Sequence, residues 1–105
     1  MSITIHNLKN EKPTEPYDFY VDRRSPVGNP FEMQTEKDRD KVCDYYAKYM
    51  AQMLECESKD FCMYIKSMMK MLKEYGKLRL FCWCSPKRCH AEELMEYIGG
   101  KVFSP

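Results

Sequence analysis

The sequence predicts a small α/β sandwich, a single domain over residues 1–105, with three or four short strands that are partly parallel and about three helices. Three observations support this fold class. Two short strand-like segments lie near the N-terminus, two long stretches with helical spacing of apolar residues follow, and a third strand-like run precedes a last helix. Strands separated by helices favour parallel pairing in one layered domain.

The N-terminal part predicts two strands and a loop. "ITIHN" at 3–7 alternates and is β-branched, and "YDFYV" at 17–21 is aromatic and β-branched. The polar, proline-broken segment between them is a loop. The second strand leads into "DRRSPVGNPF" at 22–31, where two prolines and a glycine prevent regular structure.

The middle of the chain predicts two helices. Thr35 and Asp38 form a capping box ahead of apolar residues at helical spacing, which predicts a helix of about five turns. A second apolar stripe runs from Phe61 to Leu72, and Gly76 is expected to end that helix.

The C-terminal part predicts a strand, a turn and a helix. "KLRLFCWC" at 77–84 alternates over its whole length, which is typical of a strand. We expect Ser85 to cap the next helix and Pro86 to begin it. The two glycines at 99–100 are expected to end this helix, and "KVF" at 101–103 to form a short edge strand.

Composition narrows the function classes. The chain has 17 basic and 16 acidic side chains and a net charge of +1, which argues against nucleic-acid binding. The N-terminus lacks a signal pattern and no apolar run reaches membrane-spanning length. We therefore expect a cytoplasmic protein without a membrane partner, in which most of the six cysteines are free thiols.

The stretch "LFCWCSPKRCHAEEL" is the first candidate site. In open α/β sheets, ligands bind beyond the carboxyl ends of the strands, where this stretch begins. Cys89 and His90 are expected in the first helical turn, where the dipole lowers a thiol pKa, and Lys87 and Arg88 act in the same direction. Cys89 is thus the predicted nucleophile, His90 the general acid or base, and Cys84 the second thiol of the site.

Two other interpretations of these cysteines stay open. Cys82, Cys84, Cys89 and His90 supply the ligand types of a zinc site, although the C-x-C-x4-C-H spacing is not a zinc-knuckle spacing. A free cysteine also often serves as a small buried hydrophobe, which is the expectation for Cys82 in mid-strand.

The loop 22–31 is the second candidate site. Gly28 can take a positive φ and let the backbone approach a ligand, and paired arginines can fork onto phosphate or carboxylate. The predicted ligand-binding residues, with Cys84, are Asp22, Arg23, Arg24, Ser25, Gly28 and Asn29. The alternative is a tight proline turn whose arginines are solvated or pair with acidic side chains.

Together, "VDRRSPVGNPF" and "LFCWCSPKRCHAEEL" resemble a family of small phage and bacterial proteins known as a domain of unknown function. The resemblance runs from about Tyr17 to Tyr97. By this resemblance, the family's motif positions correspond to Arg23, Ser25, Gly28, Asn29, Pro30 and Phe31 in the first motif. In the second motif they correspond to Cys82, Trp83, Cys84, Pro86, Cys89, His90 and Ala91. It implies a phage or mobile-element setting and leaves the reaction open.

The leading hypothesis from these observations is a protein that binds a small anionic, phosphate-bearing or nucleotide-like ligand between the two motifs. Whether it is an enzyme or only sequesters the ligand stays open, and no cofactor is expected. The alternative is a non-enzymatic, zinc-stapled interaction module that uses Cys82, Cys84, Cys89 and His90. A second copy of the chain or a host protein is a further possible partner, through surplus tyrosine and methionine.

Overall fold

The computed structural model describes residues 2–84 and 87–102. Its elements in chain order are β1 (Ser2–Asn7), β2 (Asp18–Tyr20), the 3-10 turn η1 (Glu36–Asp38), α1 (Arg39–Glu55), α2 (Lys59–Tyr75), β3 (Lys77–Cys82) and α3 (His90–Val102). The predicted α/β fold class is confirmed.

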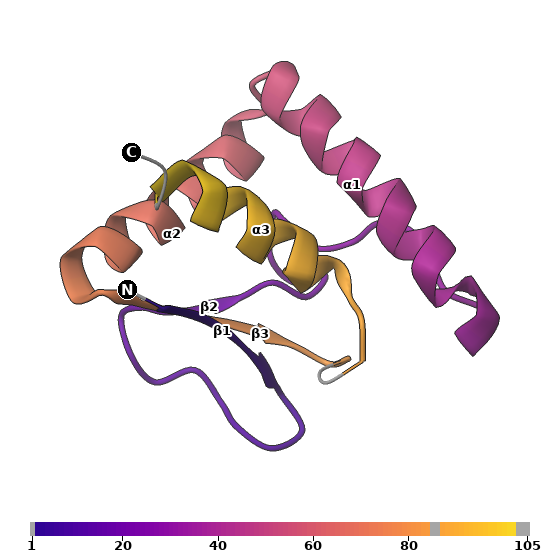
Figure 1. Ribbon diagram of the computed structural model, residues 1–105, viewed down its shortest axis with the longest axis horizontal. Helices are drawn as coiled ribbons and strands as arrows, with labels where there is room; N and C mark the ends of the chain where they lie inside the picture. Colours follow the sequence, from indigo (N-terminus) through magenta and orange to yellow (C-terminus); the bar gives the residue numbers. More distant parts are fainter. Residues whose placement is uncertain (1, 85–86, 103–105) are drawn as a thin grey trace.

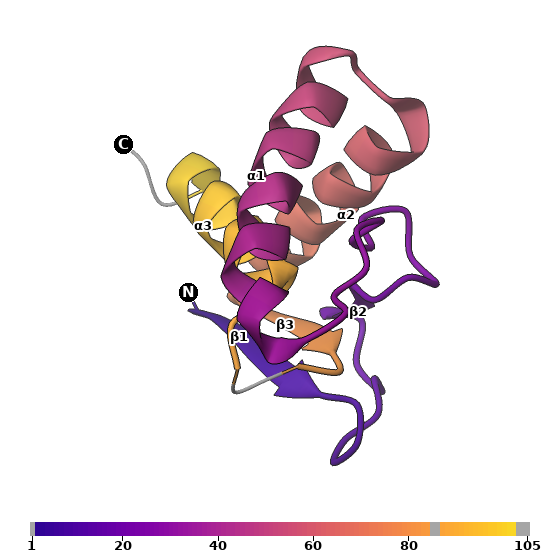
Figure 2. The ribbon, with the colours of Figure 1, turned by 90° about the vertical axis from the view of Figure 1, so that its right-hand side faces the viewer.

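The strands form one three-stranded sheet in the order β1-β3-β2, with both pairings parallel. Ile3 lies opposite Leu78, and Phe19 lies opposite Leu80. The strand nearest the C-terminus is therefore central, and it separates the two N-terminal strands (Figure 2). Since all strands run the same way, their carboxyl ends share one edge of the sheet.

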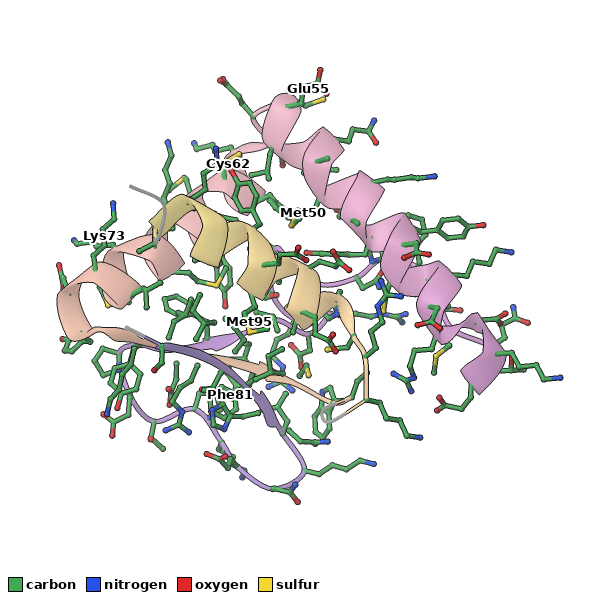
Figure 3. The ribbon with its side chains drawn as sticks, in the orientation of Figure 1. Met50, Glu55, Cys62, Lys73, Phe81 and Met95 are labelled. Atoms are coloured by element: carbon green, nitrogen blue, oxygen red, sulfur yellow. The ribbon has the colours of Figure 1, made fainter. Side chains whose placement is uncertain are left out.

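The helices all lie on the same side of the sheet (Figures 1 and 2), where α2 and α3 pack on the strands and α1 packs on α2 and α3. Leu78, Leu80 and Cys82 alternate along β3 and join the buried cluster that the helices complete. Phe81 points the other way (Figure 3) and is still fully buried, because the His6 ring stacks on it at 5.2 Å.

Local sequence signals set several helix ends as predicted. The capping box of Thr35 and Asp38 is present, and it starts the turn η1 that leads directly into α1. Gly76 ends α2 with a φ of 70°, the left-handed conformation that glycine adopts without a steric penalty.

The C-terminal prediction was wrong about both ends of the last helix and about the edge strand. α3 begins at His90, so residues 87–89, Cys89 included, precede the helix. α3 continues through the glycines at 99 and 100 to Val102, so Lys101 and Val102 are helical and do not begin an edge strand. Packing of Val102 against the core, beyond the glycines, opposes the cost of about 1 kcal/mol for each of the two helical glycines. Phe103 lies outside the described residues, as do Ser85 and Pro86.

The strand predicted over 77–84 ends at Cys82, so Trp83 and Cys84 lie just past the carboxyl end of β3. Within the described ranges, none of the helices combines the length and apolar character needed to cross a bilayer.

Candidate functional site

The two motifs line a single cavity of about 490 Å³, here called the motif cavity. It lies beyond the carboxyl ends of β2 and β3, where a parallel sheet was expected to place a ligand. The loop and the residues just after it contribute Asp22, Arg23, Arg24, Asn29, Phe31 and Met33. The stretch from the end of β3 to the start of α3 contributes Cys82, Trp83, Cys84, Arg88, Cys89 and His90. Helix α1 contributes Arg39, Val42 and Cys43.

Asp22 organises the loop side of the cavity. Its side chain is almost fully buried, and Oδ2 accepts hydrogen bonds from Arg24 Nε at 2.9 Å and from Trp83 Nε1 at 3.0 Å. Oδ1 accepts from the backbone N–H of Arg24 at 3.3 Å. One carboxylate therefore joins the end of β2 to the segment that follows β3.

Ser25 and Gly28, two of the predicted ligand-binding residues, are not among the residues that line the cavity. The Ser25 hydroxyl donates to the carbonyl of Asp22 at 2.8 Å, and the Ser25 carbonyl accepts from the Gly28 N–H at 3.2 Å. Both residues thus fold the loop onto itself.

The expected positive φ of Gly28 is not found, because the positive φ among the glycines of the described ranges belongs to Gly76. Gly28 is needed for close packing within the loop. A Cβ atom there would lie 2.5 Å from the Asp22 carbonyl oxygen and 2.7 Å from Arg23 Cα. The backbone of Gly28 therefore packs against the protein's own chain, and the prediction that it approaches a ligand was wrong.

Tyr46 of α1 anchors the middle of this loop. Its ring is fully buried, and its hydroxyl donates a 2.6 Å hydrogen bond to the carbonyl of Val27, which is also fully buried. Burial raises the Tyr46 pKa far above its usual range, so the hydroxyl keeps its proton and stays a donor. The loop is consequently held against α1.

The loop arginines both line the cavity and hold the loop. Arg23 donates to the carbonyls of Asn29 at 3.3 Å and Phe31 at 3.4 Å, and lies 3.6 Å from Glu32. Arg24 binds Asp22, and its guanidinium lies 4.3 Å from the centre of the Tyr20 ring. Both arginines therefore pair with acidic side chains, which was the alternative considered for them, and both also line the cavity.

The thiols of the second motif are packed together, and their environments differ. Cys89 Sγ lies 3.3 Å from Cys82 Sγ, and both side chains are buried. Hydrogen bonds to Cys82 and Cys84, together with burial, raise the pKa of Cys89. The lowered pKa expected for Cys89 is therefore reversed in the structure.

Cys84 has the lowered pKa instead. A hydrogen bond from Cys89 is the largest cause, Arg39 adds to it, and together they lower the pKa of Cys84 to about 6 against the opposing effect of burial. The thiolate thus lies at Cys84, which is half-buried at the cavity.

Arg39 is a site residue that the sequence interpretation missed. Its Nη1 donates to the Arg88 carbonyl at 2.9 Å, its other nitrogens bind Glu36, and its side chain is 15% exposed. A usable signal existed: a basic residue in the first turn of a helix opposes the dipole, which implies another role for it.

Lys87 and Arg88 do not act on Cys89 as predicted. Lys87 pairs with Glu36 at 3.3 Å. Arg88 binds the carboxylates of Asp40 at 3.0 Å, Asp44 at 2.9 Å and Glu93 at 3.2 Å. Arg88 thereby links α1 to α3, since each helix supplies acidic partners.

His90 is the first residue of α3 and lies at the cavity, as expected. Its Nε2 donates a hydrogen bond to the carbonyl of Val21, and its ring meets the Tyr46 ring edge-on at 4.9 Å. Burial lowers its pKa, so the imidazole is neutral with its proton on Nε2. Nδ1 is then the nitrogen that can accept a proton.

The four proposed zinc ligands do not converge on one point. Nε2 of His90 is bound to the Val21 carbonyl, and Cys89 contacts Cys82 and Cys84. Within residues 2–84 and 87–102, no set of three or more His, Cys, Asp or Glu side chains is arranged to hold a metal ion.

Comparison with known families gives one match. A family model described as "Domain of unknown function (DUF4326)" matches residues 5–100, which is most of the chain and includes both motifs. The chain belongs to this family. The expected membership of a small family of unknown function is confirmed, and the DUF4326 region contains every residue that lines the motif cavity. No curated protein and no solved structure matches the chain.

Proposed function

We propose that the protein binds a small phosphate-bearing, nucleotide-type ligand in the motif cavity. The observation that carries this proposal is the convergence of two sequence-distant motifs on one cavity with four arginines in its wall: Arg23, Arg24, Arg39 and Arg88. Guanidinium groups present forked N–H donors that match phosphate oxygens. The anion is therefore expected on the arginine-bearing side.

Arg23 is the arginine best placed to take the anion. Its Nε and Nη2 bonds to carbonyls are long, at 3.3 and 3.4 Å, and its side chain is 61% exposed. Its carboxylate partner Glu32 is 77% exposed, so this pair is weak and screened by solvent. A phosphate can replace Glu32 without leaving a buried charge unpaired.

Cys84 supplies the reactive thiolate of the motif cavity. If the ligand is turned over, we assign the nucleophile to the Cys84 thiolate in place of Cys89, with Arg39 and Cys89 as positioning residues. His90 stays the proposed general acid or base, since its neutral imidazole lines the cavity. The Cys84 thiolate is equally compatible with a protein that only sequesters its ligand.

The test is isothermal titration of the protein with inorganic pyrophosphate and with ADP. We expect Arg23→Ala to weaken both by about tenfold or more, because a charge-assisted hydrogen bond contributes about 1.5–3 kcal/mol. Glu32→Gln is the matched control, and removal of the competing carboxylate should leave binding equal or tighter. Far-UV circular dichroism must show both variants folded.

Failure of the wild-type protein to bind either compound would refute the proposal. Undiminished affinity in Arg23→Ala would refute the assignment of the anion to this arginine.

The zinc-stapled interaction module is the second candidate, and the packing of the three thiols of Cys82, Cys84 and Cys89 favours it. It requires Nδ1 of His90 to approach the thiols, while Nε2 can keep its bond to the Val21 carbonyl. A drop in melting temperature on addition of a chelator, reversed by zinc, would support the module. An unchanged melting temperature would favour the ligand pocket.

The proposal includes a cytoplasmic location and the phage or mobile-element setting that the family resemblance implies. All six cysteines are free thiols, which suits a reducing compartment.

A further inference from the structure

Trp83 has an exposed aromatic ring at the wall of the motif cavity. It is the single tryptophan of the chain, it lines the cavity, and it is 48% exposed. Tryptophan is highly buried on average in folded proteins, and a half-exposed indole at the wall of a cavity offers an aromatic face to a ligand. The proposed phosphate site does not account for it.

The indole is fixed at its edge. Nε1 donates to Asp22 Oδ2 at 3.0 Å, and the backbone carbonyl of Trp83 accepts from Asn7 Nδ2 at 3.3 Å. Asp22 is itself 8% exposed, so the anchor is buried while the ring is not. A rigid aromatic ring loses little conformational entropy when a ligand packs on it.

The same anchor places the indole beside an arginine. Asp22 Oδ2 accepts from Trp83 Nε1 and from Arg24 Nε, at 3.0 and 2.9 Å. Asp22 therefore ties the indole to the loop that carries Arg23, the arginine assigned to the anion, and Trp83 and Arg23 both line the motif cavity. A ligand with a planar ring and a phosphate on one small frame can contact both side chains.

We infer that Trp83 is a stacking platform for a nucleobase, which makes nucleoside phosphates the ligand class in preference to sugar phosphates or inorganic phosphate. The inference rests on the proposed function, which supplies the phosphate site. Nucleobases stack on aromatic rings with little dependence on base identity, and one stack is worth about tenfold or more in affinity.

The test compares AMP with ribose 5-phosphate, which keeps the phosphate and sugar and lacks the base. AMP is expected to bind at least about tenfold more tightly. It should also quench the tryptophan emission, which comes from Trp83 alone, whereas ribose 5-phosphate should leave that emission unchanged.

Three variants locate the effect, with affinities measured by calorimetry. Trp83→Leu should remove the preference for AMP, and Trp83→Phe, which keeps an aromatic face, should retain most of it. Tyr75→Leu is the matched control, because Tyr75 is 50% exposed and is not among the residues that line the motif cavity. If Trp83→Leu does not fold, Trp83→Phe and the emission of the wild-type protein carry the test.

The outcomes separate the two proposals. Equal affinity for AMP and ribose 5-phosphate would overturn the stacking inference and leave phosphate binding in place. Binding of neither compound would overturn both. A preference for AMP that survives in Trp83→Leu would place the base elsewhere and overturn the role of Trp83.

Discussion

Cys84 and Cys89 show how position within a motif determines thiol chemistry. Cys89 lies directly before α3, a location that favours a thiolate, yet it is buried against Cys82 and donates to Cys84. A buried thiol surrounded by other sulfurs is stabilised in its neutral form. Its neighbour Cys84, nearer to Arg39 and half-buried, takes the negative charge.

The first prediction concerns the reactivity of Cys84. Since its pKa is lowered to about 6, the thiolate is present above that pH and is lost as the pH falls through it. Alkylation by iodoacetamide, followed by mass spectrometry of peptides, should modify Cys84 with a midpoint near pH 6. An ordinary thiol titrates near pH 8.5.

Arg39→Gln should move this midpoint upward, because Arg39 donates to the Cys84 sulfur. Lys41→Gln, on the same helix but absent from the interactions of Cys84, is the control and should leave it in place. A midpoint above pH 8 in the wild-type protein would contradict the assignment.

Individual site residues could be predicted only as far as local sequence determines them. Asp22, Arg23 and Arg24 were found because they end a strand and enter an irregular loop, and all three line the cavity. Arg39 was missed because its contacts with Cys84 and the Arg88 carbonyl join segments far apart in the chain. The thiol pKa order likewise depends on tertiary packing.

At the scale of elements, the loop 22–31 behaves as a folded unit. Asp22 receives bonds from Ser25 and Arg24, Gly28 packs on the Asp22 backbone, and Tyr46 holds the Val27 carbonyl. These bonds satisfy backbone groups that have no strand partner. The loop positions one wall of the motif cavity without secondary structure of its own.

The second prediction compares two glycines. Gly28→Ala should lower the free energy of unfolding by about 1–3 kcal/mol, because the new Cβ would meet backbone atoms at 2.5 and 2.7 Å that cannot move aside cheaply. The control is Gly100→Ala in α3, where a Cβ meets nothing within 4 Å. It should stabilise the protein by about 0.5–1 kcal/mol, and urea unfolding measures both. Equal stability of the two variants would contradict this account of Gly28.

Elements were predictable where their ends carry local chemistry. The Thr35 capping box and Gly76 as a left-handed helix end are both present. The glycines at 99–100 misled because glycine ends a helix only when packing does not continue beyond it. Here Val102, beyond the glycines, still contacts the core. All three helices lie on one side of the sheet because of tertiary packing, and no local sequence signal predicted this.

At the scale of the whole molecule, His90 connects the sheet to the helical layer. It begins α3, donates to the carbonyl that follows β2, and contacts Tyr46 of α1. The lowered pKa means that the folded state keeps this imidazole neutral. The unfolded chain, with an ordinary histidine pKa near 6.5, takes up a proton below that pH.

The third prediction follows from this difference in proton uptake. His90 should make the protein less stable as the pH falls below about 6.5, by up to about 1.4 kcal/mol between pH 7.5 and 5.5. His90→Gln offers an amide N–H to Val21 and cannot titrate, so this part of the pH dependence should vanish.

Urea unfolding of both proteins at the two pH values is the measurement. The comparison matters because the lowered pKa of Cys84 also favours stability at the higher pH, and only the difference between the proteins isolates His90. The same pH dependence in both would contradict the prediction.

The strand order also constrains how the chain acquires its structure. β1 and β2 are the first strands along the chain, and the partner of both is β3, which ends at Cys82. Neither of the two can form its pairing with β3 before α1 and α2, which lie between β2 and β3 in the chain, have been made. The ribosome therefore releases most of these residues before the sheet begins to form. Until then, the backbone groups of β1 and β2 lack their native hydrogen-bonding partner. Protection of the N-terminal third during synthesis must come from its polar and proline-rich loops or from chaperones, because its own hydrogen-bonding partner does not yet exist.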